Sequence, residues 1–197
     1  MLSPLSLSLA IESLDPSTRG HGARVTAFAL IVARRLACTF RELQAIRLGG
    51  PVHDVGKVQI PDDLLLKPGP LDDEERDVVR VHPEAGAELV RDIPWLAPGL
   101  ACVLYHHERW DGLGYPLGLA GHEIPHEARV LAVADAYDAM TSNRPYRRAL
   151  AQAAAIAEVE RCAGTQFDPR VSAAFADAWR DGELEASRPS GDLRAAS

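Results

Sequence analysis

Five histidines and two aspartates are the residues of this sequence best suited to chemistry, because imidazole and carboxylate groups bind transition metals. The histidines include an adjacent pair, His106-His107, and one aspartate directly follows a histidine, in His53-Asp54. The second aspartate, Asp135, interrupts the apolar stretch VLAVADAYDAM. A buried carboxylate without a partner is costly, so Asp135 requires a cation nearby. A metal ion is the simplest such cation.

The set favours two metal ions over one. One ion would be surrounded by three imidazoles, and the other by two imidazoles and a carboxylate. These groups are His82, His106 and His107 for the first ion, and His21, His53 and Asp135 for the second. Asp54 has two carboxylate oxygens and can bridge the ions. Mixed imidazole and carboxylate ligation suits transition metals better than magnesium or calcium. We expect two divalent ions, iron or manganese in first place, with zinc or nickel as alternatives.

Simpler interpretations stand beside this one. A single buried histidine is more often a core residue bonded to a carbonyl oxygen than a metal ligand. A further pattern, His122-Glu123-Ile124-Pro125-His126, matches the zinc-protease motif H-E-x-x-H by letter. That motif requires both histidines on one face of a continuous helix. Because Pro125 would break such a helix, we interpret the match as coincidence.

The elements that must position these residues are predicted to be helices. Val25, Phe28, Ala29, Val32 and Leu36 follow helical spacing, and no alternating strand pattern is longer than five residues. The sequence therefore predicts an all-α fold. The other predicted helices cover Arg41–His53, Asp72–His82, Pro83–Asp92, Pro98–Glu108, His126–Ser142, Ala149–Ala163 and Pro169–Trp179.

Two predicted helices carry local start signals. Asp72 with Glu75 three residues later forms a capping-box pattern, and Asp168 precedes a proline at the first helical position. Residues 60–70 are predicted to form a loop. The segment 110–125 is rich in glycine and proline and is predicted to form a second, longer loop. A loop of this length inside a small helical domain is usually functional.

Composition narrows the class of protein. The chain has 197 residues, which suits a single domain. Its net charge of −7 argues against binding long nucleic acid. No apolar stretch is long enough for a membrane span. The cysteines Cys38, Cys102 and Cys162 suit free thiols in a reducing cytoplasm, so we expect a cytoplasmic protein without disulfides.

The motifs as a set resemble the HD-GYP family of cyclic di-GMP phosphodiesterases, a branch of the HD-domain metal-dependent phosphohydrolases. The Gly-Tyr-Pro signature stands at residues 114–116. The matching segments are HDVGKVQIPDDLLLKPGPL, HPEAGAELV, HHERWDGLGYPLGLAGHEIP, ARVLAVADAYDAMTSNRPYR and GTQFDP. The resemblance implies a helical HD domain over residues 15–182, with an extension at 1–14 and a flexible tail at 183–197.

By matching position, the resemblance also assigns roles to individual residues. Asp54 and Lys57 are expected to be catalytic. Lys57, Tyr115, Arg144 and Arg147 are expected to contact substrate. Simpler roles remain open for these four, as surface charges or, for Tyr115, as a residue that packs the loop or meets a partner. The implied metal ligands are His21, His53, Asp54, His82, His106, His107 and Asp135.

The resemblance implies that the enzyme hydrolyses cyclic di-GMP to the linear dinucleotide pGpG by means of a metal-activated hydroxide, with further cleavage to GMP left open. Some family members place a glutamate four residues before the first histidine for a third metal. Here that position is Ser17, so two metals are expected. Family members often carry a receiver or sensor domain in front, and with only 20 residues before His21 we expect none in this chain.

Two other functions remain as alternatives. One is a non-catalytic sensor or adaptor that docks a diguanylate cyclase (a GGDEF protein) through the Gly-Tyr-Pro loop. The other is a hydrolase of another nucleotide, such as cyclic GMP-AMP or a mononucleotide.

Overall fold

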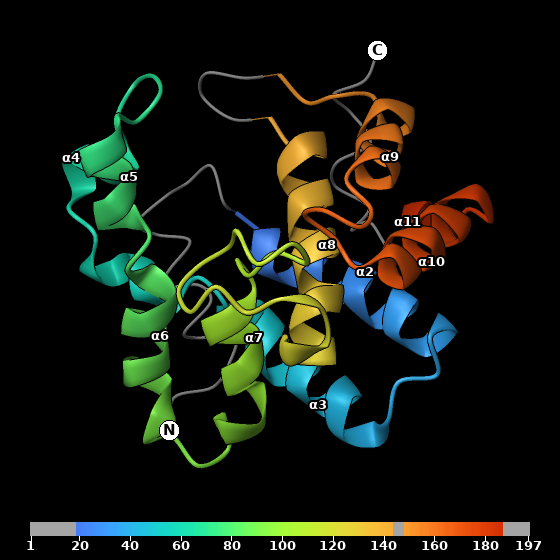
Figure 1. Ribbon diagram of the computed structural model, residues 1–197, viewed down its shortest axis with the longest axis horizontal. Helices are drawn as coiled ribbons and strands as arrows, with labels where there is room; N and C mark the ends of the chain where they lie inside the picture. Colours follow the sequence, from blue (N-terminus) through green and yellow to red (C-terminus); the bar gives the residue numbers. More distant parts are fainter. Residues whose placement is uncertain (1–18, 144–147, 187–197) are drawn as a thin grey trace.

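The structure is a computed structural model that describes residues 19–143 and 148–186, and within these ranges it contains helices and no strand (Figure 1). The all-α prediction is therefore confirmed. The α-helices are α2 (His21–Arg35), α3 (Phe40–Gly49), α4 (Asp62–Leu65), α5 (Asp73–Val79), α6 (His82–Arg91), α7 (Leu100–Tyr105), α8 (His126–Thr141), α9 (Gln152–Arg161), α10 (Pro169–Arg180) and α11 (Glu183–Ala186). Short 3₁₀ turns are η2 (Gly50–Val52), η3 (Val55–Gln59), η4 (Ala97–Gly99) and η5 (Gly121–Glu123).

The main hydrophobic core surrounds α8, which lies between α2, α3, α7, α9 and α10 (Figure 1). Tyr137 of α8 is fully buried, and its ring lies 5.5 Å from that of Phe28 in α2 and 5.0 Å from that of Phe175 in α10. Aromatic pairs of this kind add about 0.5–1.5 kcal/mol to the free energy gained by burial. The core thus fixes α2 against α8, the two helices that carry His21 and Asp135.

A second, smaller core fixes the remaining histidine-bearing elements. Its buried residues come from η2, η3, α6, α7 and the α6–η4 connection. They are Val52, Val55, Val90, Leu96 and Val103. The packing holds the His53-Asp54 turn against the helices that carry His82 and precede His106.

The segment after α3 differs from the prediction of one helix from Arg41 to His53. The α-helix ends at Gly49, and the chain continues through η2 and η3. Pro51 explains the difference, because proline has no backbone N–H and disfavours the helical conformation in the residue before it. His53 and Asp54 consequently lie in the turn between the two 3₁₀ segments, rather than on a helix face.

Other predicted helices are confirmed within a few residues, among them α6, α8 and α10. The Asp72 capping box is present, since its side chain accepts from the Glu75 amide at 2.9 Å. The Asp168 carboxylate accepts from the Arg170 amide at 2.8 Å. The helix predicted over Pro98–Glu108 is shorter and ends at Tyr105.

Two predicted irregular segments contain helical turns. The first is α4, which lies inside the loop predicted over residues 60–70 and begins after Pro61. The second is α11, at the start of the predicted tail. Leu184 is 1% exposed there, and Arg35 donates to the Glu183 carboxylate at 2.9 Å. One buried leucine and one ion pair therefore order a segment whose composition alone suggested a tail. Residues 187–197 lie outside the described ranges.

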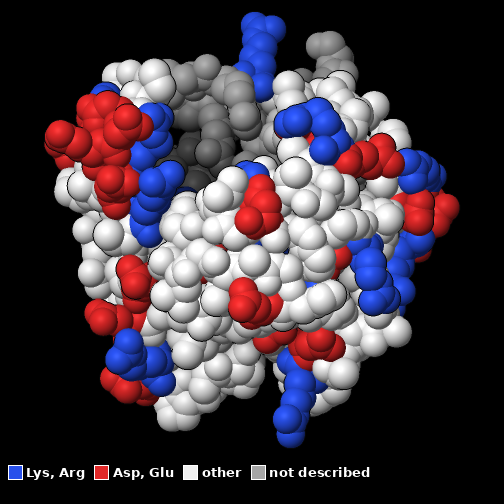
Figure 2. Space-filling view, viewed as in Figure 1, with Lys and Arg blue, Asp and Glu red and all other residues white. Residues whose placement is uncertain are grey.

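Charged side chains of both signs are distributed over the face of the molecule that Figure 2 shows. On the face seen in Figure 2, Lys and Arg side chains are interspersed with Asp and Glu, and no extended basic surface is visible among the described residues. Across 19–143 and 148–186, no helix has the length and hydrophobicity that crossing a bilayer requires.

Gly56 allows η3 to lie directly on α6. A Cβ atom at position 56 would lie 1.9 Å from the carbonyl oxygen of His82 and 2.5 Å from the amide nitrogen of Gly86. Both atoms belong to the backbone, so neither can move without shifting α6. The absence of a side chain at position 56 thus brings Asp54 close to His82.

We expect Gly56→Ala to lower the free energy of unfolding by about 2–3 kcal/mol, because the added methyl group overpacks two backbones. Urea denaturation measures this change. Gly182→Ala is the control: open space surrounds this position, and only its φ of 77° is unfavourable, at about 1 kcal/mol. Equal losses in the two variants would contradict the close-packing argument.

Candidate metal centre

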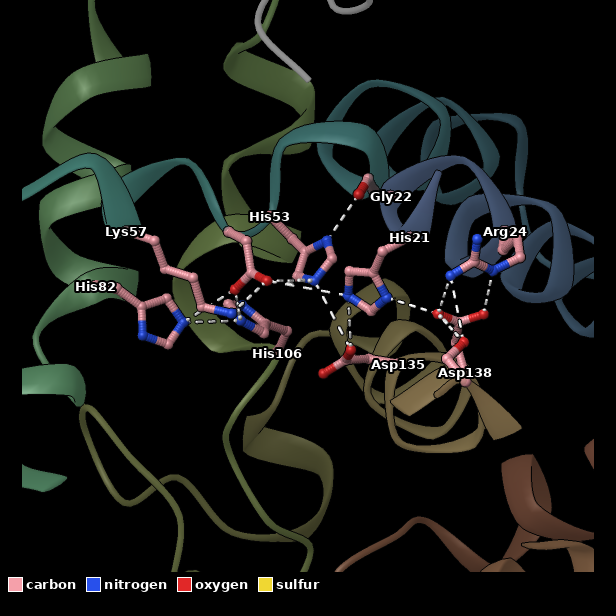
Figure 3. Close-up of polar contacts among 12 residues, drawn as sticks. His21, Gly22, Arg24, His53, Lys57, His82, His106, Asp135 and Asp138 are labelled. Atoms are coloured by element: carbon pink, nitrogen blue, oxygen red, sulfur yellow. Dashed lines mark hydrogen bonds and ion pairs between the residues drawn. The ribbon is translucent and has the colours of Figure 1, made fainter. Parts of the chain in front are cut away.

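Asp54 lies at the centre of the histidine cluster, and its two carboxylate oxygens face different groups. Oδ1 lies 3.4 Å from His82 Nε2 and 3.8 Å from His106 Nε2. Oδ2 lies 3.6 Å from His53 Nε2 and 3.9 Å from His21 Nε2 (Figure 3). The carboxylate is therefore placed to share its oxygens between two neighbouring cations.

Each half of the cluster could hold a metal ion. Asp54, His82, His106 and His107 each offer a ligand atom within one compact group, and His21, His53 and Asp54 form a second group. Asp135 adjoins the second group, with Oδ1 at 3.2 Å from His21 Nε2 and 3.9 Å from His53 Nε2. The structure thus brings together all seven residues that the resemblance implied as ligands.

Hydrogen bonds at Nδ1 fix the orientation of four imidazoles. Three of these nitrogens contact backbone carbonyl oxygens: His53 that of Gly50 at 2.7 Å, His82 that of Val79 at 2.8 Å, and His106 that of Val103 at 2.9 Å. A carbonyl oxygen can only accept, so each Nδ1 carries the proton and each neutral ring presents the lone pair of Nε2. Metal-binding histidines characteristically make such contacts.

The fourth imidazole, His21, is oriented by a carboxylate. Asp138 Oδ2 accepts from His21 Nδ1 at 2.7 Å, and Arg24 Nε donates to Asp138 Oδ1 at 2.6 Å (Figure 3). Asp138 lies one turn after Asp135 on α8, and Arg24 lies one turn after His21 on α2. The arrangement is the histidine–carboxylate pairing that fixes the tautomer of a metal ligand.

The protonation of the cluster suits a cation. Burial lowers the pKa of His107 to about 3, and it lowers the pKa values of His82 and His106 as well. Burial also opposes ionisation of Asp54, but nearby positive charge, that of Lys57 first, keeps the pKa of Asp54 well below its usual range. His82, His106 and His107 are thus neutral imidazoles around an ionised carboxylate, which is the state that binds metal.

His21 behaves differently. Burial acts to lower the pKa of His21, but hydrogen bonds to Asp135 and Asp138 outweigh it and raise the pKa to about 9. The carboxylates of Asp135 and Asp138 therefore stabilise a positive charge near His21. Either a proton on Nε2 or a metal ion can supply that charge.

One buried atom offers a test of whether the residues fit a metal. His53 Nε2 has no hydrogen-bond partner among the described residues, although it is inaccessible to solvent. Buried polar atoms are normally paired, and an unpaired one requires an explanation. Two further ring nitrogens, His82 Nε2 and His106 Nε2, lie 3.3 Å apart. Nitrogen lone pairs converging on a carboxylate fit a cation, so the donor set suits a metal.

A pocket of about 430 Å³ adjoins the cluster. Its lining includes His106, His107 and Asp135 of the cluster, and also Tyr115 and Arg80. The Tyr115 ring stacks on that of His107, with centroids 4.8 Å apart, and the Arg80 guanidinium lies 5.6 Å from the Tyr115 centroid. The volume is in the range of sites for small ligands. Tyr115 therefore both packs the loop and lines the pocket.

The predicted long loop carries Tyr115 and is anchored by Glu108. This buried carboxylate accepts from the amides of Leu117 at 2.7 Å and Leu119 at 3.1 Å. The Asp111 amide also donates to the Thr165 carbonyl oxygen at 2.8 Å. These bonds fix the conformation of the loop beside the cluster.

Of the four residues predicted to contact substrate, Lys57 and Tyr115 lie within the described residues. Lys57 Nζ donates to Asp54 Oδ2 at 2.6 Å and is partly exposed, so it lies in an ion pair rather than free in solvent. Tyr115 lies at the pocket. Arg144 and Arg147, together with Ser17, are outside the described residues.

The zinc-protease pattern does not form a site. His122 lies in η5, Pro125 precedes α8, and His126 begins that helix. His122 packs on the Trp110 ring, whereas His126 Nδ1 contacts Glu42 Oε1 at 2.9 Å. The two histidines therefore do not share one helix face, as the interpretation of coincidence requires.

Sequence reasoning missed several residues of the site. Asp138, Arg24, Arg80 and Glu108 were not assigned a role from the sequence, although Asp138 lies three residues after Asp135. Their positions carried a signal, since Arg24 is three residues after His21 and Glu108 directly follows the histidine pair. Their partners are distant in sequence, so no local pattern could identify the contacts.

Comparison with known proteins gives similar sequences. A cyclic di-GMP phosphodiesterase response regulator, RpfG of Xanthomonas campestris pv. campestris, is 43% identical over 83% of this chain and 44% of its own length. A 3′3′-cGAMP-specific phosphodiesterase 2 of Vibrio cholerae is 34% identical over 88% of this chain and 34% of its own. The chain thus spans less than half the length of these two relatives.

Fold and family comparisons agree. The HDG"Y"P protein Bd1817 from Bdellovibrio bacteriovorus has the same fold, with a TM-score of 0.66 and 22% identity over 81% of this chain and 51% of its own. The HD domain family matches residues 6–171, a range that begins inside the predicted extension, so the boundary at residue 15 stays a prediction. The chain belongs to the HD domain family, and its resemblance to the HD-GYP branch is confirmed.

Proposed function

We propose that this chain is a metal-dependent phosphodiesterase that hydrolyses cyclic di-GMP to pGpG at a centre of two divalent ions. The observation that carries the proposal is that the two carboxylate oxygens of Asp54 face different histidines. Oδ1 faces His82 and His106, and Oδ2 faces His21 and His53. A carboxylate that faces two sets of imidazoles could hold two metal ions next to each other, as two-metal hydrolases do.

The proposed ligands are the seven residues of the cluster. His82, His106 and His107 would hold one ion, His21, His53 and Asp135 the other, and Asp54 both. We propose iron or manganese, since the donors are nitrogen and oxygen atoms without sulfur. When bound, such ions lower the pKa of a water molecule and offset charge on the phosphate oxygens.

The chain's own residues would bind and orient the substrate. Lys57 supplies a positive charge next to Asp54, where a phosphate diester would lie. Tyr115 offers a ring for stacking with a guanine base, an interaction of about 1–3 kcal/mol. Arg144 and Arg147 are proposed to bind the second phosphate. Arg80, at the pocket wall, adds positive charge beside Tyr115.

Cyclic di-GMP is preferred over other substrates because the relative with 43% identity is named for it. Cyclic GMP-AMP is the alternative, since the Vibrio cholerae relative is named for that compound. Both substrates present two phosphodiesters and at least one guanine to the same pocket, so their relative turnover must be measured.

Asp54→Asn keeps the size of the side chain but removes its charge. We expect the rate of pGpG formation to fall at least about 10²–10³-fold, with loss of bound metal, because both proposed ions share this ligand. The assay compares cyclic di-GMP with cyclic GMP-AMP, using protein reconstituted anaerobically with Fe²⁺ or Mn²⁺. The exposed Asp177→Asn is the matched control. Wild-type turnover by the Asp54 variant would overturn the proposal.

Asp138→Asn tests the support of His21. We expect metal affinity at one of the two sites to fall about 10–100-fold, because the imidazole loses the carboxylate that orients it. Competition with a chelator, followed by metal analysis, measures the affinity. Asp177→Asn again serves as the control, since that carboxylate pairs with Arg180 at the surface. Unchanged affinity at both sites would show that Asp138 does not act through His21.

Glu108→Gln tests the loop. Loss of the charged acceptor for the Leu117 and Leu119 amides should loosen the Gly-Tyr-Pro segment and raise the KM for cyclic di-GMP roughly tenfold, while kcat and metal content stay near wild type. Faster hydrogen exchange at the two amides would accompany the change. Glu158→Gln, at an exposed ion pair, is the control. A lower kcat with unchanged KM would contradict this role.

We also propose that the outer side of the loop contacts a protein partner, with a diguanylate cyclase as the candidate. The supporting observation is that Leu113 is 78% exposed and Leu117 58% exposed, on either side of Tyr115. Leu113 also lines the pocket beside the cluster, so a partner that contacts it would lie next to the proposed substrate site.

A further inference from the structure

A second group of metal-binding side chains lies apart from the His/Asp cluster. Cys38 follows the C-terminal end of α2, Glu42 lies in the first turn of α3, and His126 is the first residue of α8. Each offers one ligand atom, and the three atoms lie within 4.8 Å of one another. Figure 1 shows α3 beside the N-terminal end of α8, so three elements meet at this point.

The distances are close to those of a tetrahedral zinc site. Cys38 Sγ lies 3.7 Å from His126 Nδ1, and His126 Nδ1 lies 2.9 Å from Glu42 Oε1. Standard zinc–sulfur, zinc–nitrogen and zinc–oxygen lengths at tetrahedral angles place such ligand atoms about 3.4–3.6 Å apart. The sulfur–nitrogen distance already fits, and the nitrogen–oxygen distance needs to open by only about half an ångström.

Local structure directs two of the ligands toward the third. Ala37 has a left-handed φ of 53°, and the Cys38 amide donates to the Ala33 carbonyl oxygen at 2.9 Å, which turns the chain sharply at the end of α2. The Thr39 amide and hydroxyl donate to Glu42 Oε2 at 2.6 and 2.7 Å. These bonds hold the carboxylate with Oε1 directed at His126.

The surroundings suit an exchangeable cation. The side chains of His126 and Glu42 are 28% and 22% exposed, so an ion and a water molecule can reach them. Burial and the carboxylates of Glu42 and Glu127 together raise the pKa of the Cys38 thiol to about 11, against the opposing charge of Arg129. The negative charge of the two carboxylates would also favour a cation bound at this position.

We propose that Cys38, Glu42 and His126 form a mononuclear site for a divalent cation of the zinc type. The three residues supply sulfur, oxygen and nitrogen, and water completes the coordination. Binding forms a bond from Cys38 Sγ to the cation, and the thiol proton passes to solvent.

The site would act as a clamp between α2, α3 and α8. His126 lies about 13 Å along α8 from Asp135, from the helical rise of 1.5 Å per residue. Occupation would thus tie together the helices that carry His21 and Asp135 without touching the catalytic cluster. This inference does not rest on the proposed function, because none of the three residues belongs to the His/Asp cluster.

Cobalt substitution distinguishes the two sites. Only a thiolate gives the intense sulfur-to-cobalt charge-transfer absorption in the near ultraviolet, so Co²⁺ bound at the His/Asp cluster is silent in this band. The His/Asp cluster also takes up Co²⁺, so we expect titration of the whole chain under reducing conditions to give, at saturation, a band that corresponds to one thiolate-bound Co²⁺ per chain. Excess Zn²⁺ should remove the band.

Variants assign the band to residues. Cys38→Ser should abolish it, whereas Cys162→Ser, at a thiol with no histidine beside it in the described structure, should retain it. His126→Gln and Glu42→Gln should each weaken Co²⁺ binding at least tenfold, with circular dichroism confirming that every variant is folded. Absence of the band in the wild type, or its survival in Cys38→Ser, overturns the site. Wild-type affinity in both His126→Gln and Glu42→Gln also overturns it, because the thiol would then bind alone.

Discussion

The Nδ1 hydrogen bonds of the histidines are the constraint on which the candidate centre depends. His53, His82 and His106 each donate to the carbonyl oxygen of a residue three positions earlier, and His21 donates to Asp138. Each bond fixes both the tautomer and the direction of the ring. Four Nε2 atoms consequently face Asp54, in a region from which water is largely excluded.

The same bonds form where helical segments end. His53 and His106 both follow the end of a helical segment, and each ring bonds to a carbonyl oxygen within the segment that precedes it. Pro51 ends the regular hydrogen bonding before His53, and the end of α7 at Tyr105 has the same effect for His106.

The sequence was sufficient for features that arise from local chemistry. Helices α8 and α10 and the Asp72 capping box follow from periodicity and from start signals a few residues long. The seven residues of the cluster could be selected by residue type, and the resemblance to a family then implied that they are ligands of one centre, because their spacing along the chain contains no information about distance in space. Contacts such as Arg24 with Asp138 could not be predicted, since they join residues 114 positions apart.

Helix α8 contacts helices that are distant from it in the sequence, so local sequence patterns do not predict these contacts. Tyr137 fixes it in the core, while Asp135 and Asp138 on the same helix direct charge toward His21. The carboxylates Asp135 and Asp138 need oppositely charged or hydrogen-bonding partners where they are removed from water, and both partners come from α2, namely His21 and Arg24. The fold therefore requires a positive charge at the place where the proposed chemistry requires a cation, so the demands of stability and of catalysis coincide at His21.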